Sequence, residues 1–154
     1  MKVVNQMYPS YEQIAPLADN GDGGPIAMVN LLKFRERAVY DDGRPDDISG
    51  REAYMRYATE MRKIVEGAGG SFAFSGDVHA VIIGEVEEAW DLVGIAVYPS
   101  RAEFHRLATS PEVQEIGVHR TAGLAGQLLI LTTMPTDEAA LSAGGQRRGG
   151  AARV

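Results

Sequence analysis

The chain has 154 residues, of which 45% are hydrophobic and 23% charged, and its formal net charge is −6. This length fits one domain with a single core, and the negative charge argues against nucleic acid as a partner. The absence of cysteine excludes disulfides and thiol chemistry. No apolar stretch approaches the roughly 20 residues of a membrane span, and the N-terminus lacks the apolar core of a signal peptide. We therefore expect a cytoplasmic protein that does not bind membranes.

The first third of the chain predicts a short helix, a strand and a loop. Ser10 and Gln13 have the spacing of a capping box, which predicts a helix from Ser10 onward. The apolar run PIAMVNLLKF at 25–34 predicts a strand. The polar segment 37–48 contains glycine, proline and aspartate and predicts a surface loop.

The middle of the chain predicts one long helix followed by strands. Ser49 and Glu52 form a second capping box, apolar residues then recur at steps of three and four, and glycines at 67–70 predict the end of this helix. The runs 71–76 and 78–86 are rich in strand-forming residues. They predict a β-hairpin or one bent strand.

The last third predicts a strand, two helices and a final strand. The strand is 90–98, and Ser100 with Glu103 forms a third capping box at the start of the next helix. Ser110 precedes a proline at the first helical position, which predicts a second helix over 111–122. The run 127–133 predicts the final strand.

The predicted order, strand-helix-strand-strand-helix-strand after the first short helix, indicates an α+β domain of the ferredoxin-like type, with helices on one face of an antiparallel sheet. We assign residues 1–133 to this single domain and 134–154, with an arginine- and glycine-rich end, to a flexible tail. Both faces of the strand at 26–32 are apolar. A second subunit packed sheet against sheet is the simplest cover for the other face, so we predict a homodimer.

Asn30 interrupts an apolar strand face that it shares with Met28 and Leu32. An amide buried without partners costs about 1–3 kcal/mol. Either a protein group or a bound ligand or water must therefore satisfy it.

Arg120 is a second polar group in an apolar setting, because Val113, Ile116 and Arg120 fall on one stripe of the predicted helix. A buried guanidinium needs a partner. Three alternatives stay open at this stage: an ion pair with Asp91, a contact with an anionic or carbonyl group of a ligand, and exposure of the guanidinium to solvent.

Several other residues are candidates for chemistry. As a residue type, histidine suits the role of a general base at neutral pH, but for His119 the sequence favours a surface position with pairing to Glu115. Trp90 begins a face with small residues at Gly94 and Ala96, which predicts either a pocket or close helix packing. The remaining histidines, His79 and His105, lack metal-ligand spacing, so we expect no metal and no other cofactor. Tyr54 and Tyr57 lie in the buried stripe of the long helix, where phenols need partners.

The blocks MVNLLKF, YMRYATEM, WDLVGIAVYPSRAEF, SPEV and HRTAGL, in this order, resemble the family called domain of unknown function 1330, over roughly residues 8 to 133. That family belongs to the dimeric α+β barrel superfamily, which includes cofactor-free monooxygenases, polyketide cyclases, isomerases and haem-binding enzymes. The resemblance implies a barrel-like dimer with a small-molecule pocket in each subunit.

Two functions follow as expectations. The first is a small cofactor-independent enzyme that cyclises, isomerises or oxygenates a carbonyl, enol or aromatic compound. In it, His119, Asp91 or Tyr54 would move a proton, and the ligand would bind to Asn30, Arg120, Trp90, Phe34 and Tyr57. The second is a dimer without catalytic activity, which binds a small molecule or has a structural role.

Overall fold

The computed structural model of the chain describes residues 4–18, 23–45 and 47–134. It contains four helices and four strands within these ranges. In chain order they are α1 (Tyr11–Ala18), β1 (Ile26–Phe34), α2 (Gly50–Gly67), β2 (Ser71–Asp77), β3 (Leu92–Tyr98), α3 (Arg101–Ala108), α4 (Pro111–Gly123) and β4 (Leu124–Thr133).

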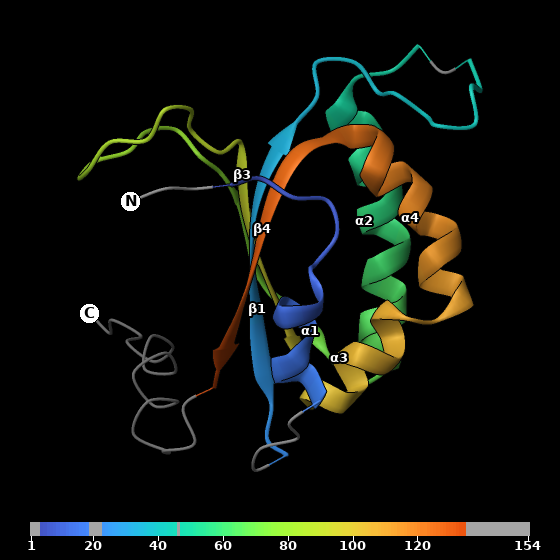
Figure 1. The fold of residues 1–154 in the computed structure, drawn as a ribbon, viewed down its shortest axis with the longest axis vertical. Coiled ribbons are helices and arrows are strands. Elements are labelled where there is room, and N and C mark those ends of the chain that lie inside the picture. Colours follow the sequence, from blue (N-terminus) through green and yellow to red (C-terminus); the bar gives the residue numbers. More distant parts are fainter. Residues whose placement is uncertain (1–3, 19–22, 46, 135–154) are drawn as a thin grey trace, which may run out of the picture.

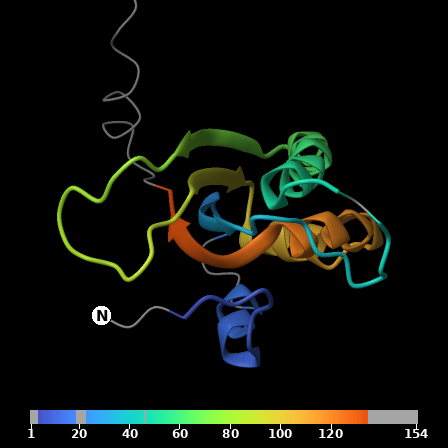
Figure 2. The ribbon, with the colours of Figure 1, turned by 90° about the horizontal axis from the view of Figure 1, so that it is seen from above.

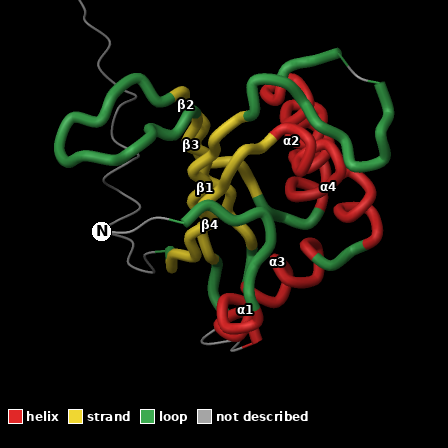
Figure 3. Tube along the Cα trace, turned by 45° about the horizontal axis from the view of Figure 1, so that its top comes forward, coloured by secondary structure: helices red, strands yellow, loops and turns green. Residues whose placement is uncertain are grey.

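The four strands form one antiparallel sheet in the order β2-β3-β1-β4. Helices α2, α3 and α4 lie on one side of this sheet (Figures 1 and 3). This order, with a helix after the first and third strands, is the ferredoxin-like α+β fold, which confirms the predicted fold class.

Local capping signals place the helix starts correctly. At α2 the Ser49 side chain accepts from the Glu52 backbone N–H, and the Glu52 carboxylate accepts from the Ser49 N–H, so the predicted capping box is complete. Ser10 and Gln13 make the same reciprocal pair before α1. At α3 only half of the predicted box forms: Ser100 caps the Glu103 N–H, whereas the Glu103 carboxylate pairs with Arg106.

The core lies between the sheet and the helices. Strand residues Ile26, Met28 and Ala96 pack against Met61 and Val65 of α2 in the main cluster. A second cluster at the other end of the sheet contains Leu32, Leu92 and Leu124. Burial of these side chains, at about 25 cal/mol per Å² of apolar surface, holds the helices on the sheet.

Within the described residues, no helix lies over the opposite side of the sheet (Figure 2). Side-chain alternation and the strand register place a continuous set of apolar residues there: Phe74, Val93, Ile95, Val97, Ala27, Val29, Leu31, Leu128 and Ile130. We call this set the open sheet face. Phe74 is 52% exposed and Ile130 is 45% exposed, so the second apolar face predicted from the sequence is present and is partly accessible to water.

Helices α2 and α4 approach each other most closely where α2 begins and α4 ends. A Cβ atom added to Gly123 would lie 2.4 Å from the Gly50 carbonyl oxygen and 2.7 Å from the Tyr54 nitrogen. The Gly123 carbonyl also accepts a hydrogen bond from the Arg35 N–H at 2.8 Å. Glycine at both positions therefore sets the spacing of α2 and α4, the helices that cover Asn30 on the sheet.

The prediction of a strand over 78–86 is wrong. This segment is an irregular loop in which Ile82 is 87% exposed and Ile83 is 93% exposed. Its strand-forming composition finds no neighbouring strand to pair with, because β2 ends at Asp77 and β3 begins only at Leu92. Composition alone therefore did not decide pairing.

The predicted flexible tail lies outside the described residues, apart from Met134. None of the helices in the described ranges has the length and apolarity needed to cross a membrane.

Candidate functional site

A polar row crosses β2, β3 and β1 in the middle of the helix-facing side of the sheet and ends at Leu129 of β4. Asn30 stands directly opposite Gly94 of β3, and Gly94 stands opposite Ser75 of β2. Between β1 and β3 the rows on either side are apolar, with Met28 opposite Ala96 and Leu32 opposite Leu92. A Cβ atom added to Gly94 would meet no heavy atom closer than 3.7 Å. The missing side chain at Gly94 therefore leaves room for about a methyl group beside Asn30.

The Asn30 amide is satisfied by protein groups. Its Oδ1 accepts a hydrogen bond from Gln127 Nε2 at 2.9 Å, and its Nδ2 donates to the Met28 carbonyl oxygen at 3.2 Å. Gln127 was not singled out from the sequence. Because Gln127 is opposite Leu32 in the β1–β4 register, it lies on the same face as Asn30, and only the register shows this pairing.

Three tyrosine side chains lie in the layer between the sheet and α2. Tyr54 and Tyr57 have ring centroids 5.7 Å apart, and the Tyr54 ring lies 5.5 Å from the Phe34 ring. Tyr98 of β3 is 5% exposed. Burial raises the pKa of each of the three phenols above its ordinary value. All three phenols are therefore neutral at physiological pH and retain the O–H proton.

None of these three phenol groups hydrogen-bonds to another residue in the described part of the chain. A phenol removed from bulk water normally has a hydrogen-bond partner. The donors of Tyr54, Tyr57 and Tyr98 are therefore available to water or to a ligand.

Arg120 extends from α4 toward the N-terminal segment and the tyrosines. Its Nη1 and Nη2 donate to the Met7 carbonyl oxygen at 3.1 and 2.6 Å, and its guanidinium lies 5.8 Å from the centroid of the Tyr8 ring. Burial raises the pKa of Tyr54 and of Tyr57, and the positive charge of Arg120 opposes this rise at both phenols. Among the residues described, no carboxylate forms an ion pair with it.

The suggested ion pair between Arg120 and Asp91 is absent. Asp91 Oδ2 instead accepts from the Phe34 backbone N–H at 2.8 Å, and Oδ1 lies 3.2 Å from Lys33 Nζ. The Asp91 N–H donates to the Leu32 carbonyl at 2.8 Å. Asp91 therefore joins the end of β1 to the start of β3. Among Phe34, Tyr54 and Tyr57, it hydrogen-bonds only to Phe34, through the backbone N–H.

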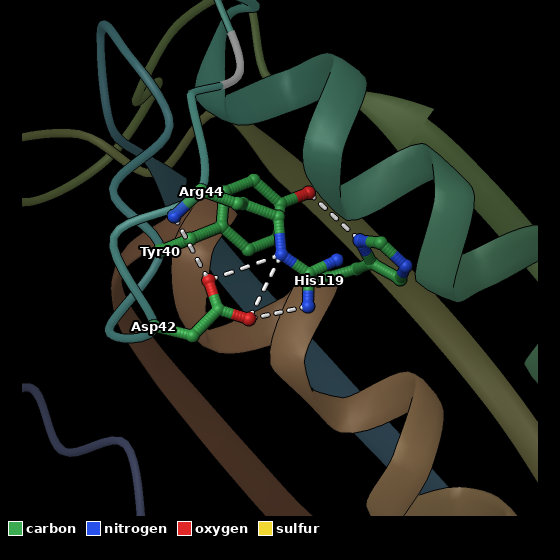
Figure 4. Close-up of polar contacts among 4 residues, drawn as sticks. All are labelled: Tyr40, Asp42, Arg44 and His119. Atoms are coloured by element: carbon green, nitrogen blue, oxygen red, sulfur yellow. Dashed lines mark hydrogen bonds and ion pairs between the residues drawn. The ribbon is translucent and has the colours of Figure 1, made fainter.

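His119 faces the loop before α2, whereas Arg120 faces the N-terminal segment. His119 Nδ1 lies 2.7 Å from the Tyr40 hydroxyl, and the two rings meet edge to face at 5.6 Å (Figure 4). The Arg44 guanidinium lies over the Tyr40 ring and pairs with Asp42. Tyr40 is 8% exposed, so this contact fixes the loop on α4.

Trp90 precedes β3 and is half-buried. Within the described ranges its indole makes no ring contact with Phe34, Tyr54 or Tyr57. Of the eight residues predicted for the site, the structure therefore brings together Phe34, Tyr54, Tyr57 and Arg120, with Asn30 in the polar row of the same interface. His119, Asp91 and Trp90 have other surroundings.

The described residues contain no group of three or more histidine, cysteine or acidic side chains arranged for a metal ion. A shallow depression of about 450 Å³ lies on α2, lined by Arg51, Glu52, Met55, Arg56 and Thr59. None of the predicted site residues lines this depression.

Comparison with known proteins shows the family. The model of the domain of unknown function DUF1330 matches residues 45–134, more than half of the 154-residue chain. The chain belongs to the DUF1330 family. The match begins in the loop before α2, so β1 with Asn30 and Phe34 precedes the segment of this DUF1330 chain that the family model covers.

The DUF1330 chain is also similar to solved structures. A protein of unknown function from Rhodopseudomonas palustris, RPA0582, is 33% identical with a TM-score of 0.77, and the alignment covers 87% of this chain and 100% of that one. Methylated RPA0582 gives 34% identity, a TM-score of 0.77, and coverage of 87% and 98%. A dimeric ferredoxin-like protein of unknown function from Jannaschia sp. CCS1 is 11% identical with a TM-score of 0.48, covering 72% and 100%. No curated protein matches the chain.

Proposed function

We propose that the protein binds a small organic molecule with a carbonyl, enol or carboxylate group between the sheet and α2, and that it catalyses proton transfer on this molecule. The observation that supports this proposal is the setting of Arg120. A half-buried guanidinium without a carboxylate partner in the described ranges lies near two neutral phenols. This combination provides positive charge and O–H donors for one negatively charged oxygen.

The chemistry of these groups favours a reaction that passes through an enolate. Transfer of a proton from the carbon next to a carbonyl to a solvent water molecule places negative charge on the carbonyl oxygen, and donors fixed near that oxygen lower the barrier to this step. Isomerisation and cyclisation both begin with such a step, and the proton transfer requires no cofactor. Tyr54, which is neutral and close to Arg120, is the residue to which we assign donation to the developing oxyanion.

The remaining candidate residues have supporting roles in this proposal. Phe34 and Tyr57 form an apolar wall beside Tyr54. Asn30 and the space over Gly94 form the floor on the sheet. His119 is hydrogen-bonded to Tyr40, and Asp91 is bound by Lys33 and the Phe34 N–H. We therefore assign neither residue a role in proton transfer.

Replacement of Arg120 by methionine tests the proposal. We expect benzoate and acetophenone to raise the melting temperature of the wild-type protein, and Arg120→Met to weaken benzoate binding about 10-fold or more, because a hydrogen bond to a charged group contributes about 1.5–3 kcal/mol. Thermal shift and calorimetry measure this change. Arg62→Met, at an exposed position of α2, is the matched control.

Because Arg120 also binds the Met7 carbonyl, a second variant is needed that leaves this contact intact. Tyr54→Phe removes one phenol hydroxyl and leaves the hydrogen bonds between Arg120 and the Met7 carbonyl intact. If the protein is an enzyme of the proposed kind, it accelerates the exchange of the acetophenone α-protons in D2O, followed by NMR, and Tyr54→Phe slows this exchange. Unchanged benzoate binding in both variants would refute the proposed site.

A second candidate function is binding without turnover. It is favoured by the closed Asn30–Gln127 pair and by the occupation of two Arg120 donors by the Met7 carbonyl. The same experiments separate the two functions. The second function is supported if benzoate binding depends on Arg120 and the wild-type protein does not accelerate proton exchange.

We also propose that two chains pair through the open sheet face to form a homodimer. Its apolar side chains extend over all four strands and are partly exposed in the single chain, which is unusual for a monomer. Ile95→Lys, in the middle of this face, is expected to convert the dimer to a monomer in sedimentation analysis because it would bury an unpaired charge. Lys63→Ile, at an exposed position of α2, should leave the dimer intact.

A further inference from the structure

Residues 78–91 connect β2 to β3 and extend away from the body of the protein; we call this segment the arm. Both the front view and the view from above show the arm on the side of the sheet opposite the helices (Figures 1 and 2). The arm therefore extends beyond the open sheet face.

The base of the arm is held in place by several polar contacts. The Val78 N–H donates to the Asp91 carbonyl at 3.0 Å, which closes the two ends of the arm on each other. Lys33 Nζ donates to the Ala89 carbonyl at 3.1 Å and pairs with Glu88 at 3.1 Å. These contacts fix the direction in which the arm leaves the sheet.

The tip of the arm is apolar and exposed. Val81, Ile82, Ile83 and Val86 are 46%, 87%, 93% and 47% exposed. Gly84 between them has a φ of 91°, a conformation that favours glycine and reverses the chain there. An anchored loop that presents neighbouring isoleucines to water marks an interaction surface.

The size of the open sheet face indicates what this tip contacts. Four strands about 4.8 Å apart and about seven residues long, at about 3.3 Å per residue, give a face of roughly 450 Å² in projection. A stable interface buries about 800 Å² on each partner. The accessible surface of this face is larger than its projection, so sheet-to-sheet contact forms the centre of an interface of about this size, and an arm on the same side of the molecule adds to it.

We propose that the tip of each arm packs against a second copy of this chain. In the sheet-to-sheet dimer, the arm of each subunit then contacts the other subunit. In a two-fold pair each arm makes the same contact, so one tip sequence contributes twice. An anionic membrane surface fits the tip less well, because Glu85 and Glu87 follow the isoleucines closely in the chain and would be repelled. This inference rests on the homodimer proposed above.

The double substitution Ile82→Asp and Ile83→Asp tests the arm. We expect the dissociation constant of the dimer, measured by sedimentation equilibrium, to rise at least 10-fold. Val118→Asp, at a 41% exposed position on α4, is the matched control and should leave it unchanged. An unchanged dissociation constant in the double variant overturns the arm contact, whereas a monomeric wild-type protein overturns the homodimer itself.

A cross-linking experiment gives an independent result if the double variant aggregates. The chain has no cysteine, so Ile83→Cys introduces a single thiol for a benzophenone label. Illumination is expected to give a covalent dimer, and the same label at Val118→Cys is expected to give none. Labelled Ile83→Cys protein that is dimeric in solution but forms only internal cross-links contradicts the proposal.

Discussion

Replacing Gly123 with alanine is expected to destabilise the folded protein by about 3 kcal/mol or more. The new Cβ would lie 2.4 Å from the Gly50 carbonyl oxygen and 2.7 Å from the Tyr54 nitrogen, and both are backbone atoms that cannot turn aside. The helices α2 and α4 would have to separate, which costs packing over their whole contact. For a chain of this size the melting temperature should fall by roughly 6–12 °C.

Gly117, one and a half turns earlier in α4, is the matched control. A Cβ there would meet no heavy atom within 4 Å, and the residue is in the helix interior. Gly117→Ala should therefore stabilise the protein by about 0.5–1 kcal/mol, through the higher helix propensity of alanine. Urea unfolding of both variants measures the difference. Equal effects of the two substitutions would show that the close approach of α2 and α4 does not limit the fold.

The stability of the protein is expected to fall steeply above about pH 10. Burial raises the pKa of Tyr54, Tyr57 and Tyr98 in the folded state, while the same phenols titrate near 10.0 when unfolded. Between these pKa values the unfolded state has released protons that the folded state retains. The contribution to stability is present below pH 10 and is lost as the pH rises, by up to about 1.4 kcal/mol per pH unit for each tyrosine.

Urea titrations at several pH values between 9 and 11.5 measure this slope. Tyr54→Phe removes one of the three phenols and should make the slope smaller by up to about 1.4 kcal/mol per pH unit. Tyr11→Phe serves as the control because the Tyr11 ring is 86% exposed in the folded chain. A wild-type slope that Tyr54→Phe leaves unaltered would mean that the Tyr54 hydroxyl is not removed from water on folding.

Local sequence signals predicted most of the fold. The capping residues Ser49 and Glu52 act within one turn of helix, so their effect does not depend on the rest of the chain. The apolar run in β1 likewise indicated a strand with apolar residues on both faces. The segment 78–86 was misassigned because its strand-forming residues have no neighbouring strand, and pairing is not a local property.

The candidate site was predicted in its parts but not in its connections. The sequence placed Arg120 on an apolar helix stripe, which indicated correctly that its guanidinium needed a partner. That partner, the carbonyl of Met7, is 113 residues away in the chain. Asn30 is joined to Gln127 across 97 residues. No periodicity in either segment indicates which of several polar groups will face the other after folding.

The sequence by itself determined where the four helices begin, that both faces of β1 are apolar, and that Asn30 and Arg120 interrupt apolar surfaces. Only the tertiary structure decided that Asp91 joins two strands, that His119 holds the loop through Tyr40, and that Arg120 lies near Tyr54 and Tyr57. The physical reason is the range of the interactions. Capping and alternation act over a few neighbouring residues, whereas the partner of a polar side chain depends on strand register and helix spacing, which the whole chain sets together.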